Sequence, residues 1–257
     1  MRYAILMILL TLSSVSCGPP PVASPSALPP QPVRFESKAS KGDGSRMFVY
    51  SWPAEVAAEP NLASFLLRER TRLLAEEEAE WDAALRDAPA GCVSCQMREL
   101  RKEWSVLGDV PAFLSLAADI YQYTGGAHGM SHRQSLVWDR AAGEPREAID
   151  LFVSPAVLQD AIGPALCAAL DAERGTRRGM PASRTNREWP NQCPALDEAS
   201  VLVASSQGKT FDRIAIYFGP YVAGPYAEGA YELVFPVDAA ITSAVKPAFR
   251  TAFAAPR

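Results

Sequence analysis

Both histidines of the chain lie in one glycine-rich segment, residues 121–132, with the sequence YQYTGGAHGMSH. An imidazole titrates near neutral pH, so His128 could act as a general base. Asp119 or Asp139 could orient it, as a carboxylate orients the base of many hydrolases. The sequence has no Gly-x-Ser-x-Gly elbow, and no cysteine is placed as an obvious thiolate nucleophile. A peptidoglycan-active hydrolase that uses His128 is therefore an alternative hypothesis, and we assign no catalytic residue.

A zinc site is a second possibility for the same segment. Cys92 and Cys95 have two residues between them, and His128 and His132 have three, which are spacings found within the ligand pairs of structural zinc sites. The two pairs are far apart in sequence, and a glycine-rich turn does not align residues four apart as a helix does. A structural zinc domain is thus the second alternative. We expect neither a metal nor another cofactor.

A binding surface is the chemistry that we favour. Tyrosine rings have flat faces and a polar tip, which suits them to stack on sugars and to donate hydrogen bonds. Paired glycines allow backbone conformations closed to other residues, so the turn can present a histidine beside exposed main chain. Tyr121 offers the same kind of ring, and Glu228 and Glu232 could bind amino groups of a ligand. The candidate ligand-binding residues are Tyr123, Gly125, Gly126, His128, Tyr221, Tyr226 and Glu228.

The first residues have the pattern of an export signal. Arg2 supplies positive charge, and residues 4–12 form an apolar run of signal-peptide length that is too short to span a bilayer. Small residues then precede Cys17, in a pattern that resembles the lipobox of bacterial lipoproteins, with Ser14 where an aliphatic residue is usual. The resemblance implies a signal peptide at residues 1–16 and lipidation of Cys17. Secretion without a lipid is the alternative.

Residues 17–32 follow as a proline-rich stretch that has no charged residue. Such a sequence cannot build a core and favours extended polyproline II, so we expect a tether that holds the folded part off a membrane. Four cysteines remain in the mature chain, and an even number in an exported protein indicates disulfides. Three pairings are possible. We prefer Cys92–Cys95 with Cys167–Cys193, because this closes one tight loop and one polar loop.

The remaining pattern predicts an α+β fold, with antiparallel sheets and about three helices packed on them. Residues 173–194 are polar and include five arginines, so we expect a loop there that the second disulfide pins. The expected helices cover residues 62–87, a segment from Pro155 onward, and 237–253. The expected strands cover residues 33–40, 46–52, 97–107, 110–123, 135–139, 147–152, 211–218 and 230–236.

Two segments are similar to a known pair of bacterial envelope domains. Residues 123–129 (YTGGAHG) and residues 218–237 (FGPY, PYAEG and FPV in order) resemble the domains of unknown function 4163 and 3298. These occur in anti-sigma factors of the RsiV type and beside deacetylases of the PdaC type. The resemblance implies a first α+β module at residues 33–125 and a second at residues 126–257. It implies envelope sensing or binding, and no catalytic residue comes with it.

The sequence therefore predicts an exported, lipid-anchored protein of the cell envelope, in the periplasm or at the outer membrane. Its expected role is that of a non-catalytic binding or sensing module. The expected partners are the membrane, through the N-terminal lipid, and a glycan such as a peptidoglycan fragment or an envelope protein as ligand. The net charge of −4 gives no basic excess of the kind that nucleic-acid binding requires.

Overall fold

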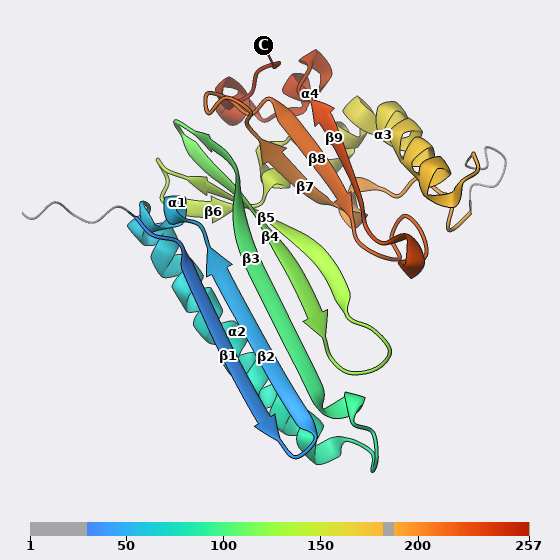
Figure 1. Ribbon diagram of the computed structural model, residues 1–257. Coiled ribbons are helices and arrows are strands. Elements are labelled where there is room, and N and C mark those ends of the chain that lie inside the picture. The colour runs from blue at the N-terminus through green and yellow to red at the C-terminus, as the bar shows by residue number, and fades with distance from the viewer. Residues whose placement is uncertain (1–29, 182–187, 257) are drawn as a thin grey trace, which may run out of the picture.

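The computed structural model of the protein describes residues 30–181 and 188–256. The predicted signal peptide, Cys17 and most of the predicted tether lie outside the described residues. A long sheet carries one long helix on one face, and a shorter sheet with further helices lies across one end of it (Figure 1). The α+β class is confirmed.

The long sheet has six strands in sequential order. All neighbouring pairs are antiparallel except β2 and β3, which are parallel. That pair differs from the expected antiparallel arrangement. It arises because α2 (Pro60–Asp87) crosses over between the two strands, as parallel neighbours require. The strands are β1 (Val33–Lys41), β2 (Gly44–Trp52), β3 (Met97–Val110), β4 (Phe113–Tyr123), β5 (Met130–Asp139) and β6 (Glu144–Arg146).

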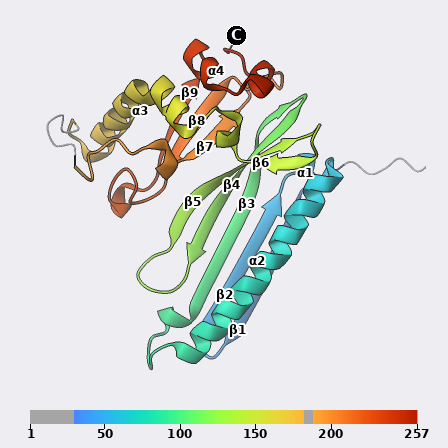
Figure 2. The ribbon, with the colours of Figure 1, turned by 180° about the vertical axis from the view of Figure 1, so that it is seen from behind.

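The helix α2 covers one face of the long sheet, as the view from behind shows (Figure 2). The short helix α1 (Ala54–Ala57) precedes it, and Pro60 lies in its first turn, where proline is well tolerated because no N–H is needed there. Leu62 and Leu66 of its apolar face are fully buried against the aromatic rings of Phe48 and Tyr50. This packing is the first core of the protein.

The strand β4 is buried on both faces. Leu114 and Leu116 belong to the core beneath α2, whereas Phe113 and Ala117 contact the second sheet and its surroundings. Successive side chains of a strand point to opposite faces, so a strand that lies between two cores needs consecutive apolar residues.

The short sheet consists of β7 (Ser200–Ala204), β8 (Arg213–Phe218) and β9 (Tyr231–Pro236), all antiparallel. The Ser115 hydroxyl donates a 2.7 Å hydrogen bond to the Val203 carbonyl and so joins the two sheets.

The helices α3 (Pro155–Arg178) and α4 (Ala239–Ala244) pack on the short sheet. The expected start of α3 is confirmed, since the Ser154 hydroxyl accepts from the Val157 N–H at 3.2 Å and proline occupies the first turn.

Three expectations about local structure were wrong. The segment expected as a strand at residues 147–152 contains a 3-10 helix, Ala148–Leu151, in which Glu147 N–H donates to the Asp150 carboxylate. The closing helix stops at Ala244, and a separate 3-10 helix runs over Pro247–Ala252, because proline cannot donate the next helical hydrogen bond. The polar stretch at residues 173–194 begins as helix, since α3 continues to Arg178.

The predicted boundary between two modules, at residues 125 and 126, lies in the β4–β5 turn. The strands β4 and β5 pair continuously from Phe113 opposite Asp139 to Gln122 opposite Met130. One sheet therefore contains strands from both predicted modules, and the division stays a prediction. Within the described residues, no helix combines the length and the hydropathy needed to span a bilayer.

A buried ion pair joins α2 to the long sheet. Lys102 Nζ lies 2.7 Å from Glu69 Oε1 and donates to Gln134 Oε1 at 2.6 Å, and both charged side chains are largely buried. The Tyr50 hydroxyl donates to the other Glu69 oxygen and accepts from Trp104 Nε1 at 3.0 Å. Burial lowers the pKa of Lys102 and raises that of Tyr50. The cation thus depends on its partners, because a buried charge without them is costly.

We predict that Glu69→Ala lowers the free energy of unfolding by about 3–5 kcal/mol, since it leaves the Lys102 charge buried and unpaired. Urea denaturation measures this. The matched control on the same helix is Glu76→Ala, which removes the exposed partner of Arg72 and should cost less than about 1 kcal/mol. Equal effects of the two substitutions would contradict the prediction.

Candidate functional site

The β4–β5 loop and the β8–β9 loop meet and bring three predicted site residues together. The His128 ring stacks on the Tyr226 ring with 3.9 Å between centroids and 21° between planes. The Tyr221 hydroxyl lies 3.3 Å from His128 Nε2, and its ring centroid is 5.5 Å from that of Tyr226. The Tyr226 hydroxyl donates to the Gly129 carbonyl at 2.9 Å. We call His128, Tyr221 and Tyr226, together with Trp189 described below, the aromatic cluster.

Glycines shape the loop that carries His128. Gly125 and Gly126 have φ values of 93° and 95°, which side chains rarely allow, and the Tyr123 hydroxyl closes the turn by donating to the Gly126 carbonyl at 2.7 Å. A Cβ atom at Gly125 would lie 3.0 Å from the Ser94 carbonyl oxygen, so the loop packs against the Cys92–Cys95 turn. Two of the predicted residues, Gly125 and Gly126, thus set the backbone of the loop.

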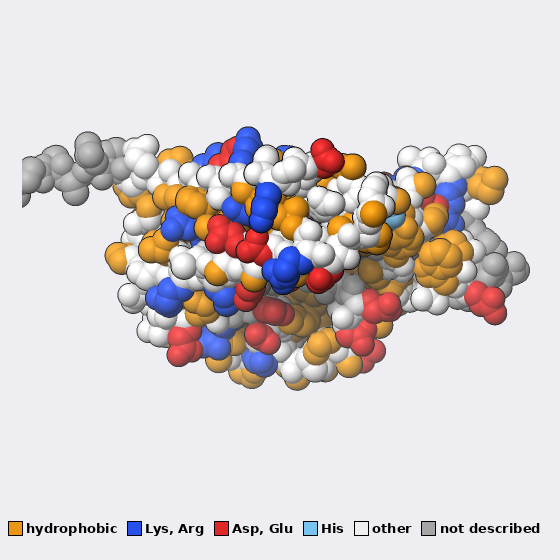
Figure 3. Space-filling view, turned by 90° about the horizontal axis from the view of Figure 1, so that it is seen from below, with side chains coloured by type: hydrophobic (Ala, Val, Ile, Leu, Met, Phe, Trp, Pro, Cys, Tyr) orange, Lys and Arg blue, Asp and Glu red, His pale blue; other side chains and the backbone are white. Residues whose placement is uncertain are grey.

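Trp189 is a site residue that the sequence analysis did not single out. Its Nε1 donates to the Tyr221 carbonyl at 3.2 Å, and its side chain is 51% exposed. Tyr221 is 46% exposed and has a φ of 71°, in the left-handed region that residues other than glycine seldom adopt. Such backbone strain persists only where the surroundings enforce it. Figure 3 shows a histidine beside hydrophobic side chains on one side of the molecule, next to a region where charged side chains gather.

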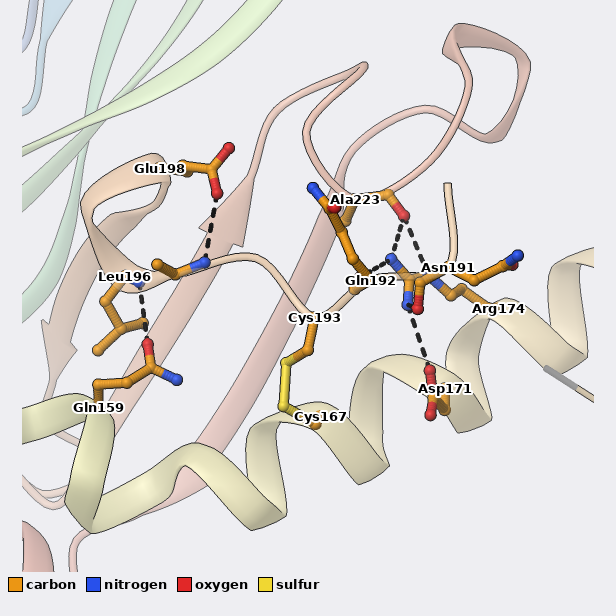
Figure 4. Close-up of a disulfide and its surroundings, with 11 residues drawn as sticks. Gln159, Cys167, Asp171, Arg174, Asn191, Gln192, Cys193, Leu196, Glu198 and Ala223 are labelled. Carbon is orange, nitrogen blue, oxygen red and sulfur yellow. Dashed lines mark hydrogen bonds and ion pairs between the residues drawn. A yellow bond between two sulfur atoms is a disulfide. The ribbon is translucent and has the colours of Figure 1, made fainter. Parts of the chain in front are cut away.

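A fully buried arginine holds the main chain beneath the aromatic cluster. Arg174 of α3 donates to the Ala223 carbonyl at 2.6 and 2.9 Å, to the Gln192 carbonyl at 2.7 Å and to the Asn191 carbonyl at 3.1 Å (Figure 4). Asp171 lies 3.2 Å from the same guanidinium. Burial lowers the pKa of Arg174, so these acceptors are needed to keep the charge in place.

The next arginines of α3 support the same loops. Arg178 Nε lies 2.7 Å from Glu228 Oε1, and Arg178 Nη1 donates to Asn191 Oδ1 at 2.6 Å. Arg177 donates to the carbonyls of Glu228 and Ala230 at 2.6 and 2.7 Å. The sequence analysis placed these arginines in a loop, and the structure places them in the last turns of a helix. Two others of that stretch, Arg184 and Arg187, lie outside the described residues.

Glu228, a predicted ligand residue, is engaged inside the protein. The Arg178 hydrogen bond lowers the pKa of Glu228, and the Tyr231 hydroxyl donates to the same carboxylate. Burial, with the Glu228 carboxylate beside it, raises the pKa of Tyr231 to about 12. We therefore assign Glu228 to the support of the β8–β9 loop. The neighbouring Glu232 is likewise paired, with Arg133 at 2.5 Å.

The geometry gives little support to catalysis by His128. Its Nδ1 lies 3.2 Å from the Gly129 carbonyl oxygen, and its Nε2 faces Tyr221. The two carboxylates expected to orient it are paired with arginines, Asp119 with Arg133 at 2.6 Å and Asp139 with Arg146 at 3.3 Å. A hydrolase would need a different group to orient this imidazole.

The cysteines of the hypothetical zinc site form a disulfide with each other and so cannot bind zinc. The structure contains the disulfides Cys92–Cys95 and Cys167–Cys193, the pairing preferred from the sequence, so no thiolate is available beside the histidines. His132 lies on β5 opposite Ile120, where burial and the nearby Lys102 lower its pKa. Among the described residues, no group of three or more histidine, cysteine or acidic side chains is arranged to hold a metal ion.

Comparison with known proteins supports the resemblance drawn from the sequence. The family model described as "Deacetylase PdaC" matches residues 57–131, which run from α1 through α2, β3 and β4 into the start of β5. A crystal structure of a DUF3298 family protein from Pseudomonas aeruginosa PAO1 has a TM-score of 0.56, with 21% identity over 85% of this chain and 95% of that chain. The chain has the fold of a DUF3298 family protein.

A second DUF3298 family structure, from Bacteroides fragilis NCTC 9343, has a TM-score of 0.46, with 14% identity over 80% of this chain and 89% of that chain. No curated protein matches this sequence. The DUF3298 fold and the PdaC match confirm the resemblance for the fold and for the matched segment. The PdaC-like segment together with two disulfides indicates a location outside the cytoplasm or in the cell envelope.

We predict that Glu228→Gln removes an acid-sensitive part of the stability. The pKa of Glu228 in the folded protein lies below its ordinary value of 4.5, so the pair with Arg178 stabilises the fold above pH 4.5. This contribution is lost as the pH falls through the lower folded pKa. Urea denaturation below pH 4.5 should therefore show wild type losing more free energy of unfolding than Glu228→Gln.

The control variant for this pH dependence is Glu173→Gln, which removes the more exposed partner of Arg177 on the same helix. It should keep the wild-type pH dependence. Parallel curves for wild type and Glu228→Gln would contradict the prediction.

Proposed function

We propose that the aromatic cluster binds a glycan of the bacterial cell envelope and that the protein is a non-catalytic binding module. The observation that supports this most directly is the stacking of His128 on Tyr226 beside Tyr221 and Trp189, with rings from three separate segments at one exposed place. The apolar faces of sugar rings pack on such aromatic faces, while hydroxyls and main-chain groups at the edge serve the sugar hydroxyls.

The surroundings of the cluster favour contacts with the neutral sugar rings of a ligand over contacts with its charged groups. The nearest carboxylate of the β8–β9 loop, Glu228, is neutralised by Arg178 and Tyr231. Arg174 is buried and Arg177 is bound to carbonyls. The polar groups at the cluster are hydroxyls, an imidazole and an indole, which suit the hydroxyl and amide groups of an amino-sugar chain such as peptidoglycan.

We further infer that the protein is anchored by a lipid at Cys17. The folded part begins at β1, whose Val33 pairs with Trp52, whereas the His128 loop follows the far end of β4 beyond Tyr123 (Figure 1). A tether at the N-terminus would thus leave the aromatic cluster away from the point of attachment. A proline-rich chain of this kind reaches about 3 Å per residue, which supports contact with a glycan layer above the membrane.

We predict that isothermal titration of the purified mature protein shows binding of a soluble peptidoglycan disaccharide-peptide fragment. Tyr226→Ala and His128→Ala should each weaken binding roughly tenfold, because each removes one stacked ring worth about 1.5 kcal/mol. The matched control is Val234→Ala, which removes an exposed apolar side chain on β9. It should bind as wild type does.

Two outcomes would overturn the proposal. If wild type bound neither the peptidoglycan fragment nor a chitin-type oligosaccharide, but bound an envelope protein through the same residues, the ligand would be a protein. If wild type converted the fragment to products and His128→Ala did not, while remaining folded, the protein would be a hydrolase. Chromatography of the fragment before and after incubation distinguishes the second case.

A further inference from the structure

The disulfide Cys167–Cys193 joins residues 188–193, which include Trp189 and are called the Trp189 segment below, to α3. Cys167 lies in the middle of the helix, and Cys193 ends the segment, with 5.4 Å between the two Cα atoms (Figure 4). Arg174, about two turns further along α3, donates to the carbonyls of Asn191 and Gln192. A covalent bond and two charged hydrogen bonds therefore hold the same short segment.

This segment also supports the β8–β9 loop. Trp189 donates to the Tyr221 carbonyl, and Arg174 bridges the segment to the Ala223 carbonyl. Arg178 joins Asn191 to Glu228 in the same way. Displacement of the segment therefore removes the Trp189 hydrogen bond to the Tyr221 carbonyl. It also takes from Arg174 and Arg178 the acceptors that the segment provides.

The disulfide lies beside an open cleft. Cys167 lines an open cleft of about 830 Å³ together with Pro164, Ala168 and Asp171 of α3. Both cysteines are only partly buried. Thiol–disulfide exchange requires direct approach of an attacking thiolate to one sulfur, and this cleft provides the approach.

We propose that Cys167–Cys193 is a redox-sensitive brace that regulates the aromatic cluster, a proposal that rests on the proposed function. A dithiol attacks one sulfur, forms a mixed disulfide and releases the first cysteine as a thiolate. The second thiol of the reductant then attacks the reductant's own sulfur in the mixed disulfide and releases the other cysteine as a thiolate. Two electrons and two protons reach Cys167 and Cys193, and the reductant becomes a cyclic disulfide. The oxidised protein holds Trp189 and Tyr221 in place, and the reduced protein releases them.

Hydrogen exchange of the full mature chain tests the brace without any ligand. In Cys167→Ser/Cys193→Ser, exchange at residues 188–193 and 219–229 should become at least about tenfold faster, while β3 and β4 keep their protection. The control is Cys92→Ser/Cys95→Ser, which removes the other disulfide. The Cys92–Cys95 turn packs against the His128 loop and not against the Trp189 segment, so this variant should leave exchange at residues 188–193 unchanged. Unchanged exchange at residues 219–229 in the first variant would overturn the proposal. So would loss of protection throughout the protein, since the disulfide would then be a staple of the whole fold.

If the first variant does not fold, wild type equilibrated with dithiothreitol gives the same comparison. Alkylation followed by mass analysis shows which disulfide has opened in each sample. Titration of the same samples with the peptidoglycan fragment should show at least about tenfold weaker binding after Cys167–Cys193 has opened. Failure of the oxidised protein to bind refutes the proposed function alone, because the exchange data still decide whether the brace exists. Where the oxidised protein does bind, equal binding by the oxidised and reduced samples refutes the regulation.

Discussion

The burial of β4 on both faces is the constraint on which the rest of the structure depends. Leu114 and Leu116 complete the core beneath α2, and Phe113 and Ala117 contact the second sheet. A strand packed from both sides cannot shift its register by one residue without turning each side chain toward the wrong core. Its end at Tyr123 therefore fixes where the following loop starts. The same packing places β8 against the long sheet, since Ala117 of β4 and Ala215 of β8 share a small core. The strands that precede the two loops of the aromatic cluster therefore determine where these loops meet.

The loops themselves are ordered by a different interaction, the burial of a cation beneath them. A charged guanidinium without partners in a protein interior is costly, so Arg174 stabilises only those loop conformations that direct carbonyls at it. It has carbonyl partners from two loops that are distant in sequence. This requirement explains how irregular segments with exposed rings keep one arrangement, including the left-handed backbone of Tyr221. The exposed surface of the site is thus specified by contacts that lie underneath it.

The sequence predicted what local chemistry determines. Ser154 and Pro155 mark the start of α3, and the spacing of the cysteines suggested the disulfides that the structure contains. It did not predict the parallel pairing of β2 with β3, because pairing across a helical crossover leaves no local signal. The short β6 and β7 were missed for lack of a periodic pattern.

The candidate site was predicted in part. His128, Tyr221 and Tyr226 were named as candidates, but their contact depends on the packing of two sheets. Arg174 was misplaced because arginines in a polar stretch look alike whether they face solvent or a buried carbonyl.

The rings of the aromatic cluster are exposed, whereas the charged side chains that hold its loops are paired within the protein. This difference affects which ligand the cluster can bind. Glu228 and Arg178 satisfy each other, and Arg174 is enclosed, so the charges nearest the rings are not offered to a ligand. Stacking and hydroxyl hydrogen bonds alone give modest affinity for a single sugar, because each contact contributes little beyond the area that it buries. A repeating polymer compensates for this, since many equivalent units raise the effective concentration at one site. A tether that confines the protein to the surface where such a polymer lies has the same effect. Weak, repeated contact with an extended glycan therefore suits this surface better than tight binding of one small molecule.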